Sequence, residues 1–431
     1  METMSYEKRT LIEEAFKGNH KKVELAGWVK NTRALGKIKF IVLGDCSGEI
    51  QVTGVEKEID KKVFEQMDKL PKESVIYVKG ELKDAKQAPG GKELVPEEII
   101  VLNKSEELLP LDISESSKTE FPKRLDYRFL DFHRKKTQAI FKIQSVITNT
   151  FRNHFYNKGY MELQAPCIIS AASEGGTELF PVQYFEKKAY LAQSPQLYKQ
   201  MLACSVEKTF TITPVWRAEK HNTTRHINEI RQMDIEAAFK NQFEIMKEEE
   251  EVVIDIVKTV LENCKEELKI LEVKDLKVPK GVYLSYEEAK LKSGGKMGED
   301  FNPEEEIKLC ELYGDLVFVY SWPISLKPFY IMPKDGKSDA KMSEGFDALY
   351  KGVEITSGGQ RIHLPELLTE RIKAKGLNPT SFKSYIDSFR YGAPPHSGWS
   401  IGLERITQKI CHLDNVKEAT MFPRDRDRLT P

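Results

Sequence analysis

The sequence is poor in the features that mark secreted, membrane-bound or zinc-binding proteins. Its 431 residues include only six cysteines, and no two of them form a CxxC pair. This pattern predicts reduced thiols and argues against disulfide bonds or a zinc site. The first ten residues, METMSYEKRT, contain no apolar run of the secretory kind, and no stretch approaches the length of a membrane span. We therefore expect a cytoplasmic protein with no membrane partner.

Excess charge of either sign is also missing. The 66 Lys and Arg residues nearly balance the 67 Asp and Glu residues, so the net charge is -1. A nucleic-acid partner would have to be recognised through local basic patches rather than through a global field. A hydrophobic content of 40% is ordinary for a globular protein, and the length predicts two or three domains.

The N-terminal part reads as short strands from residue 23 to about residue 102. A helix is predicted between the third and fourth strands, in EKEIDKKVFEQMDKL, where apolar residues recur at helical spacing. Three strands, a helix and two more strands is the order of the OB-fold, a small barrel that often binds oligonucleotides. We expect such a domain in residues 1–103.

A basic patch lies within this predicted barrel. Between Trp28 and Gly44 all charged residues are basic, and they are Lys30, Arg33, Lys37 and Lys39. Phe40 lies next to the last of them. Cations mixed with an aromatic ring suit single-stranded nucleic acid. The alternative is that Phe40 belongs to the barrel core and the lysines are simply solvated.

Residues 104–133 are polar and poorly periodic, which predicts a hinge. A long helix is expected from Thr137, because one face carries Ile140, Ile143, Ile147, Phe151 and Phe155, with Gly159 as its C-cap. A strand, YMELQAPCII, follows; its Pro166 could also mark an edge strand.

The most charged local pattern is a predicted hairpin between Phe210 and Phe239. Two strand-like runs flank a tip that carries Arg217, Glu219, Lys220, Arg225 and His226. Cations at the tip of a hairpin suit a polyphosphate substrate, and the alternative is an ordinary solvated tip. Upstream, Glu174 begins a glycine-containing loop, and Ser194 is a predicted helix N-cap with Pro195 at the first helical position.

Two further segments carry weaker expectations. Four consecutive glutamates, residues 248–251, are predicted to lie on a solvated helix face. Residues 271–313 show no recognisable chemistry.

Strands are expected again from Asp315, in LVFVYSWP, PFYIMP and GFDALYKGVEITSGGQR. Asp347 and Glu354 lie seven residues apart, so on one strand they would face opposite sides; a turn at Tyr350–Gly352 or two separate strands would be needed. The alternative for Glu354 is an edge-strand glutamate. The following SGGQR is predicted to be a flexible turn that presents Arg361.

Taken together, these segments resemble a known family. The hairpin sequence WRAEKHNTTRHINE resembles motif two of the class II aminoacyl-tRNA synthetases and is similar to the aspartyl enzymes of the archaeal and eukaryotic kind. SEGGTELF and QSPQLYK are similar to the same enzymes, the long helix with Pro166 resembles motif one, and GWSIGLER resembles motif three. The resemblance covers essentially the whole chain. It implies an α+β fold with an N-terminal OB-fold anticodon-binding domain and an antiparallel-sheet catalytic domain in residues 134–431, assembled as a homodimer.

The implied reaction is the ATP-dependent attachment of L-aspartate to tRNA(Asp) through an aspartyl-adenylate, with Mg2+ as cofactor. The resemblance implies that Arg217 holds the α-phosphate, that Glu219 contacts adenine or the acceptor end, and that Arg405 stacks on adenine and touches the γ-phosphate. The remaining implied ATP-binding residues are Arg225, His226, Glu354 and Gly402. The implied metal residues are Asp347, Glu354 and Ser357. The implied amino-acid-binding residues are Glu174, Ser194, Gln196, Lys199, Asp234, Ser357 and Arg361.

The barrel resembles the anticodon-binding domain of this family, which implies that Arg33, Phe40 and Gln51 contact the anticodon. In relatives that charge only tRNA(Asp), a tryptophan and a lysine stand where this chain has Lys30 and Pro89. Their absence predicts that tRNA(Asn) is charged as well. Other departures are Gly44 in place of arginine, Ser400 in place of glycine, and Ile230 in place of an adenine-stacking phenylalanine.

Three other functions are compatible with parts of the pattern. An asparaginyl-tRNA synthetase shares the subclass, but SPQLYK and TTRH favour the aspartyl type. A small-molecule asparagine synthetase would need no anticodon reader. A catalytically inactive RNA-binding paralogue is disfavoured by the intact set of Arg217, Glu354, Arg361 and Arg405.

Overall fold

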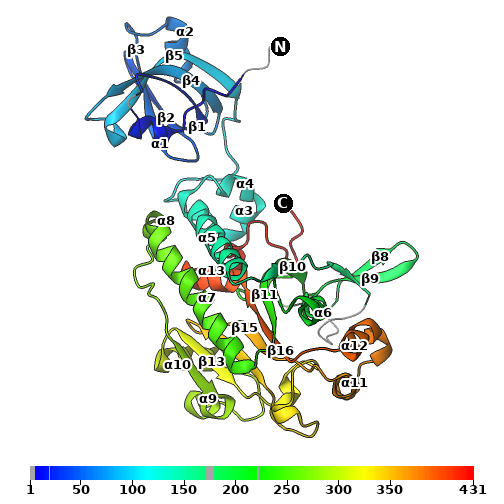
Figure 1. Ribbon diagram of the computed structural model, residues 1–431. Coiled ribbons are helices and arrows are strands. Elements are labelled where there is room, and N and C mark those ends of the chain that lie inside the picture. The colour runs from blue at the N-terminus through cyan, green and yellow to red at the C-terminus, as the bar shows by residue number, and fades with distance from the viewer. Residues whose placement is uncertain (1–4, 19, 171–178, 221–222) are drawn as a thin grey trace. The chain divides into compact units, whose positions relative to one another are not determined.

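The computed structural model describes residues 5–18, 20–170, 179–220 and 223–431. The chain divides into two compact units, Met1–Pro110 and Leu111–Pro431 (Figure 1). The division falls inside the segment predicted to be a hinge. The second half of that segment is helical, with α3 (Phe121–Asp126) and α4 (Arg128–Asp131). It belongs to the second unit, because the buried Arg128 donates to the carbonyl oxygens of Glu418, Thr420 and Met421.

The first unit is a closed barrel, as the strand order predicted. Its strands follow one another in the order β1-β2-β3-β5-β4. Their bounds are β1 (Lys22–Leu35), β2 (Ile38–Gly44), β3 (Glu49–Val55), β4 (Val75–Asp84) and β5 (Lys92–Asn103). The predicted helix α2 (Lys61–Gln66) lies between β3 and β4, and the remaining elements are α1 (Ile12–Lys17) and the 3-10 turn η1 (Pro89–Gly91). This arrangement confirms the OB-fold.

The second unit is organised around a mixed sheet. Within the described residues, eight strands pair in the order β12-β13-β14-β15-β16-β11-β10-β6. All neighbouring pairs from β13 to β10 are antiparallel. At the two edges of the sheet, β12 pairs in parallel with β13, and β6 pairs in parallel with β10. The bounds are β6 (Met161–Glu162), β10 (Lys208–Trp216), β11 (Glu229–Ala238), β12 (Gly281–Ser285), β13 (Leu316–Tyr320), β14 (Gly345–Tyr350), β15 (Val353–Gln360) and β16 (His396–Gly402). A small separate sheet pairs β7 (Ile168–Ile169), β9 (Lys187–Leu191) and β8 (Pro181–Tyr184).

Helices cover one face of the large sheet and flank its ends (Figure 1). The long helices α5 (Lys135–Asn157) and α7 (Gln242–Asn263) pack against each other, and with α8 (Lys265–Ile270) and α13 (Leu403–Ile410) they share the main core with the strands. The apolar face predicted for α5 is buried, and Gly159 after it has a φ of +77°. The other helices are α6 (Gln196–Val206), α9 (Tyr286–Ser293), α10 (Pro303–Tyr313), α11 (Pro365–Ala374) and α12 (Lys383–Arg390). In the described part of the chain no helix is long and apolar enough to span a membrane.

Two strand predictions and one turn prediction were wrong in detail. YMELQAPCII forms only β6 and β7, with irregular chain between them. PFYIMP is not a strand and contributes only isolated bridges at Ile331 and Pro333. SGGQR is not a flexible turn, because residues 357–360 belong to β15. The glycines there permit close packing: a Cβ on Gly358 would lie 2.6 Å from the Phe346 ring.

The prediction that the glutamate run faces solvent was also wrong. Glu248 and Glu249 of α7 are buried. Glu248 accepts hydrogen bonds from Tyr160 and Lys240, and Glu250 accepts them from the Gly281 amide and Tyr283. The run spans more than one face of the helix, because consecutive residues are about 100° apart.

Candidate active site

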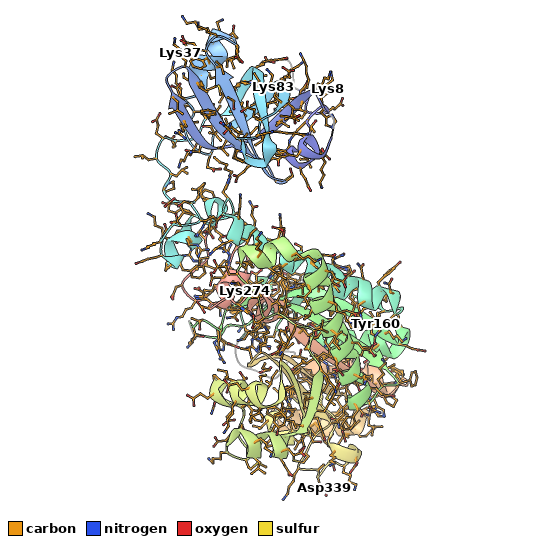
Figure 2. All side chains as sticks on the ribbon, turned by 90° about the vertical axis from the view of Figure 1, so that its left-hand side faces the viewer. Lys8, Lys37, Lys83, Tyr160, Lys274 and Asp339 are labelled. Carbon is orange, nitrogen blue, oxygen red and sulfur yellow. The ribbon has the colours of Figure 1, made fainter. Side chains whose placement is uncertain are left out.

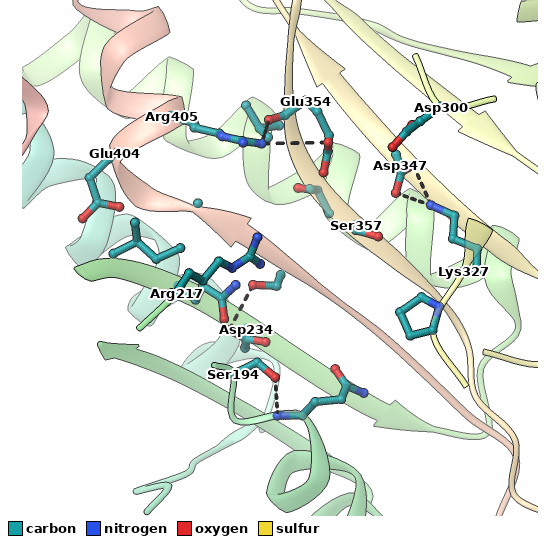
Figure 3. A pocket seen from close by; sticks show the side chains of 18 of the residues that line it. Ser194, Arg217, Asp234, Asp300, Lys327, Asp347, Glu354, Ser357, Glu404 and Arg405 are labelled. Carbon is teal, nitrogen blue, oxygen red and sulfur yellow. Dashed lines mark hydrogen bonds and ion pairs between the residues drawn. The ribbon is translucent and has the colours of Figure 1, made fainter. Parts of the chain in front are cut away.

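A cavity of about 370 Å³ lies on the sheet face that α5 and α7 leave uncovered. Along β11, Met233 and Ile235 enter the core while Asp234 between them lines the cavity. On β16, Trp399 and Ile401 are likewise in the core and Ser400 lines the cavity. Successive strand residues point to opposite faces, so the two strands present one polar side chain each. Figure 3 shows Asp234 of β11 in the same cavity as Ser357 of β15, which is far from it in the sequence.

One end of the cavity holds a buried set of opposite charges. The Lys199 ammonium lies 2.7 Å from Asp234 and 3.7 Å from Glu236. Arg361 donates from Nε to Oε1 of Glu236 at 3.0 Å and from NH2 to Oε2 at 3.3 Å. These contacts bring together the predicted amino-acid-binding residues Lys199, Asp234 and Arg361. They also add Glu236, which the sequence interpretation had missed although it lies on the same face of β11 as Asp234.

The start of α6 forms the rim of this end. The helix begins at Gln196, one residue later than predicted, and the Ser194 hydroxyl accepts the Gln196 amide at 3.3 Å. Gln196 lines the cavity and donates to Gln200 at 2.7 Å. The predicted residue Glu174 lies outside the described residues.

Ser400 has a defined partner in this end of the cavity. Its hydroxyl donates to Oδ2 of Asp234 at 3.1 Å (Figure 3). Serine at this position therefore makes a hydrogen bond that glycine could not make. Together with Lys199, Ser400 engages both carboxylate oxygens of Asp234.

The β10–β11 hairpin supplies the cations at the other end, as predicted. Asn228 closes its tip by donating from its side-chain amide to the carbonyl oxygens of Arg217 and Glu219, at 2.7 and 2.8 Å. The Arg217 side chain is 43% exposed and lies 3.8 Å from Glu219, so it remains available to a ligand. Arg225 and His226 line the same cavity.

Helix α13 begins directly after Gly402, and Arg405 in its first turn reaches this end of the cavity. Its NH1 group donates to the carbonyl oxygen of Glu354 at 2.7 Å and lies 3.9 Å from the Glu354 carboxylate (Figure 3). Ile230 also lines the cavity, beside Glu404. The Glu404 carboxyl accepts the Arg231 amide, and its burial raises its pKa to about 7.

The predicted metal residues lie on the hairpin formed by β14 and β15. A turn at Lys351 and Gly352 separates Asp347 from Glu354, as the odd spacing required, and β15 is an interior strand, so Glu354 is not an edge residue. Asp347 pairs directly with Ser357. A β-bulge at Ile355, which has no partner in the β14–β15 register, returns Glu354 to the same face as Ser357.

Lys327 is a cavity residue that the sequence interpretation did not find. Its ammonium lies 2.6 Å from both carboxylate oxygens of Asp347 (Figure 3). Burial raises the pKa of the Asp347 carboxyl, and Lys327 opposes that rise. Asp300, from the segment without recognisable chemistry, lines the cavity as well. Neither residue belongs to a local motif, so only the folded chain shows that they lie here.

The oxygen donors of Asp347, Glu354 and Ser357 are of the kind that Mg2+ prefers. Among the described residues no three acidic, His or Cys side chains converge closely enough to hold a metal by themselves. The residues therefore fit a cation held jointly by carboxylates and substrate phosphates, the usual arrangement for Mg2+.

The predicted anticodon residues share the outer face of the barrel. Arg33 pairs with Phe40 across β1 and β2, and Phe40 pairs with Thr53 of β3. Phe40 lies between the core-facing residues Lys39 and Ile41, so it is not a core residue. Gln51 donates to Thr53 and to Glu93, each at 3.1 Å.

Two of the basic residues expected to form a nucleic-acid patch are engaged within the barrel. Lys39 donates to the Phe64 carbonyl oxygen and lies 2.8 Å from Asp68. Lys30 lies 3.1 Å from Glu73, and its aliphatic part covers Gly44. Of the four basic residues, Arg33 and Lys37 are exposed, and Lys37 lies at the β1–β2 turn (Figure 2).

Comparison with known proteins agrees with this geometry. The family described as tRNA synthetases class II (D, K and N) matches residues 121–426, and the OB-fold nucleic acid binding domain matches residues 23–102. The aspartate–tRNA(Asp/Asn) ligase of Methanothermobacter thermautotrophicus is 43% identical over 417 residues, which cover 95% of each chain. The aspartate–tRNA(Asp) ligase of Pyrococcus furiosus is 44% identical over 427 residues, covering 96% of this chain and 97% of the relative.

A solved structure has the same architecture. Asparaginyl-tRNA synthetase from Pyrococcus horikoshii, complexed with asparaginyl-adenylate, superposes with a TM-score of 0.92 at 34% identity, covering 98% of this chain and 99% of the other. The matched families cover both compact units, and the similarity extends over nearly the full length of each relative. The chain therefore belongs to the class II tRNA synthetases of the D, K and N group, with an OB-fold anticodon domain.

Proposed function

We propose that this protein activates L-aspartate with ATP and transfers it to tRNA(Asp) and tRNA(Asn). The observation that carries the choice of amino acid is the pair of buried cations, Lys199 and Arg361, at one end of the cavity. Arg361 uses Nε and NH2 on Glu236, which leaves NH1 for a substrate carboxylate. A buried guanidinium and ammonium suit the side-chain carboxylate of aspartate.

The fold alone does not choose between aspartate and asparagine, because the asparaginyl enzyme of P. horikoshii has the same architecture. The charges give a reason for choosing aspartate. Asp234 and Glu236 neutralise Lys199 and Arg361. The substrate's own ammonium and carboxylate can then enter as a balanced pair, with Glu174 and Gln196 assigned to the ammonium and Ser194 assigned to the amino-acid site in general.

The proposed reaction needs positioning and charge neutralisation rather than a protein nucleophile. The aspartate α-carboxylate attacks the α-phosphorus of ATP, and pyrophosphate leaves. The 3'-hydroxyl of the terminal adenosine of tRNA then takes the aspartyl group, and AMP leaves. Arg217 stabilises the growing charge on the α-phosphate, while Arg225, His226 and Arg405 hold the outer phosphates and Glu219 contacts adenine or the acceptor end.

Asp347, Glu354 and Ser357 are the residues that we assign to Mg2+. When bound, the cation supplies charge neutralisation to the phosphate oxygens. Lys327 forms an ion pair with Asp347, so this buried carboxylate has a countercharge within the protein itself.

The proposal that both tRNAs are charged rests on the barrel. Lys30 is in an ion pair with Glu73, and its side chain does not offer a rigid, flat surface that would select one base. Pro89 has no side-chain hydrogen-bond donor. Relatives named for one tRNA and for two are about equally similar to this chain, at 44% and 43% identity, so overall similarity does not decide the point.

We also propose that residues 1–103 form the anticodon-binding domain and residues 134–431 the catalytic domain. Within residues 104–133 we assign the hinge to the part that precedes α3, because α3 and α4 belong to the second unit. We further propose a cytoplasmic homodimer. The support for the dimer is apolar surface next to the predicted motif one. Tyr156 at the end of α5 is 72% exposed, and Met161 on the edge strand β6 is 54% exposed.

The test is aspartylation of tRNA(Asp) and tRNA(Asn) transcripts under identical conditions. Comparable kcat/KM values for the two are expected. A preference for one transcript above about a hundredfold, equivalent to about 2.7 kcal/mol, would contradict the two-tRNA proposal. Failure to charge either transcript with aspartate would contradict the proposed activity itself.

A further inference from the structure

Helix α10 brings an unassigned carboxylate to the proposed phosphate end of the cavity. The helix comes from the segment of residues 271–313, for which the sequence had indicated no chemistry. Asn302 caps its start by accepting the amides of Glu304 and Glu305. Glu306 follows and is buried, whereas Glu304 on the same helix is exposed.

Contact with the β14–β15 turn places α10 against the proposed metal-binding strand. Gly352 in that turn has a φ of +75°, and a Cβ there would lie 3.1 Å from the Cα of Ile307. Only glycine allows the turn and the helix to approach so closely. Glu306 precedes Ile307 and Glu354 follows Gly352 by two residues, so this contact brings the two carboxyl groups into the same region.

Glu306 contacts a cation of the hairpin tip. Its Oε2 lies 3.4 Å from NH1 of Arg225, and the two side chains are 11% and 34% exposed. Burial and the charge of Glu354 raise the pKa of Glu306, to about 7, while Arg225 and Arg405 lower it. The carboxyl group therefore lies within the electrostatic reach of three residues that line the cavity.

We propose that Glu306 is a positioning residue that orients Arg225 towards the phosphates of ATP. Arg225 lies on a hairpin tip, and its long side chain has many rotamers. A partly buried acceptor on a helix anchored against the catalytic sheet restricts those rotamers before ATP arrives, so less conformational entropy is lost on binding. The inference rests on the proposed function, because it assumes that Arg225 contacts ATP.

The experiment compares Glu306→Ala, Glu306→Gln and the matched control Glu304→Gln in aspartate-dependent exchange of pyrophosphate into ATP. Glu306→Ala should raise the KM for ATP about three- to tenfold and leave the KM for aspartate within twofold, because partly exposed ion pairs contribute modestly. Glu306→Gln keeps an oxygen acceptor and should have a smaller effect. Glu304→Gln should match wild type.

A double-mutant cycle with Arg225→Ala decides whether Glu306 acts through Arg225. In the Arg225→Ala background, Glu306→Ala should cause no further rise in the KM for ATP. An equal rise in both backgrounds would overturn the proposal, as would parallel rises in the KM values for ATP and aspartate. A fall in the KM for ATP would also overturn it, since the carboxylate would then compete with phosphate for Arg225.

Wild-type exchange separates this inference from the proposed function. If the wild-type protein exchanges and Glu306→Ala behaves like Glu304→Gln, the inference fails and the function stands. If wild type shows no aspartate-dependent exchange, the proposed function fails. Calorimetric binding of ATP with Mg2+ to the same variants then decides the inference, with weaker binding by Glu306→Ala alone supporting it and unchanged binding overturning it.

Discussion

The ammonium of Lys199 lies 2.7 Å from Oδ1 of Asp234, and each side chain is 1% exposed. Ser400 donates to the other oxygen of the same carboxylate. Asp234, which lines the cavity, is thus held on both sides, and it pairs with the buried Lys199 at the end of the cavity where we place the substrate side chain. Removing Lys199 or Asp234 would take one charge out of a buried ion pair and destabilise the fold. Ser400 is uncharged and only partly buried, so it is the best member of the set to change.

Ser400→Ala should raise the KM for aspartate about tenfold, because a hydrogen bond to a charged group contributes about 1.5 kcal/mol. The KM for ATP and the melting temperature should change little, since Ser400 is only partly buried. Steady-state exchange kinetics with each substrate varied in turn measure this. An unchanged KM for aspartate would show that Ser400 does not help to position Asp234.

Arg217→Ala should reduce exchange by about 10²–10³-fold, the usual effect of losing one preorganised group that stabilises developing charge. Stability should be nearly unchanged, because Arg217 is 43% exposed and its nearest carboxylate oxygen, on Glu219, is 3.8 Å away. Exchange assays and thermal melts of the same preparations check both statements. A variant with near-normal exchange would mean that the hairpin tip is only a solvated surface.

Phe40→Ala should weaken aspartylation of tRNA while sparing exchange, since Phe40 lies on the outer face of the barrel. Loss of one base-stacking contact corresponds to about 1–3 kcal/mol. The measurement compares charging with tRNA-independent exchange for this variant and wild type. A parallel fall in both activities would indicate damage to the fold rather than loss of a base contact.

The sequence predicted those parts of the site that lie in continuous motifs. The hairpin with Arg217, the start of α6 with Ser194, and the strand-to-helix step with Arg405 are each encoded by neighbouring residues, so periodicity and resemblance were sufficient. The barrel was likewise predictable, because its strands alternate and its turns are short.

Other features depend on contacts that no local pattern contains. Asp300 and Lys327 line the cavity from segments with no motif, and Glu306 contacts the cavity residue Arg225 from α10, which packs against the sheet. The β-bulge at Ile355 places the Glu354 side chain on the same face of the sheet as Ser357, and a bulge has no reliable sequence signal. The burial of Glu249, by contrast, had a sequence signal. Glu249 lies three residues after Met246 and four before Val253, which places it on the apolar stripe of α7.

Glu249 gives a pH dependence of stability. Burial raises the pKa of its carboxyl from 4.5 to about 8. Between these values the unfolded chain has lost the proton that the folded chain keeps, so stability falls as pH rises, by about 1.4 kcal/mol per unit. Glu249→Gln lacks this loss and should gain stability over wild type as pH rises from 5 towards 8. Denaturant midpoints of both proteins across that range measure it, and a constant difference between them would contradict a neutral buried Glu249.

The most direct test of the account is exchange of pyrophosphate into ATP by the wild-type protein, with aspartate or asparagine as the only amino acid. Asparagine would place an amide against Lys199 and Arg361, and mispairing of buried charged groups costs about 3–5 kcal/mol. We predict a kcat/KM for aspartate that is about 10²–10⁴ times larger than that for asparagine. Equal exchange with the two amino acids, or a preference for asparagine, would contradict the assignment of this cavity to aspartate.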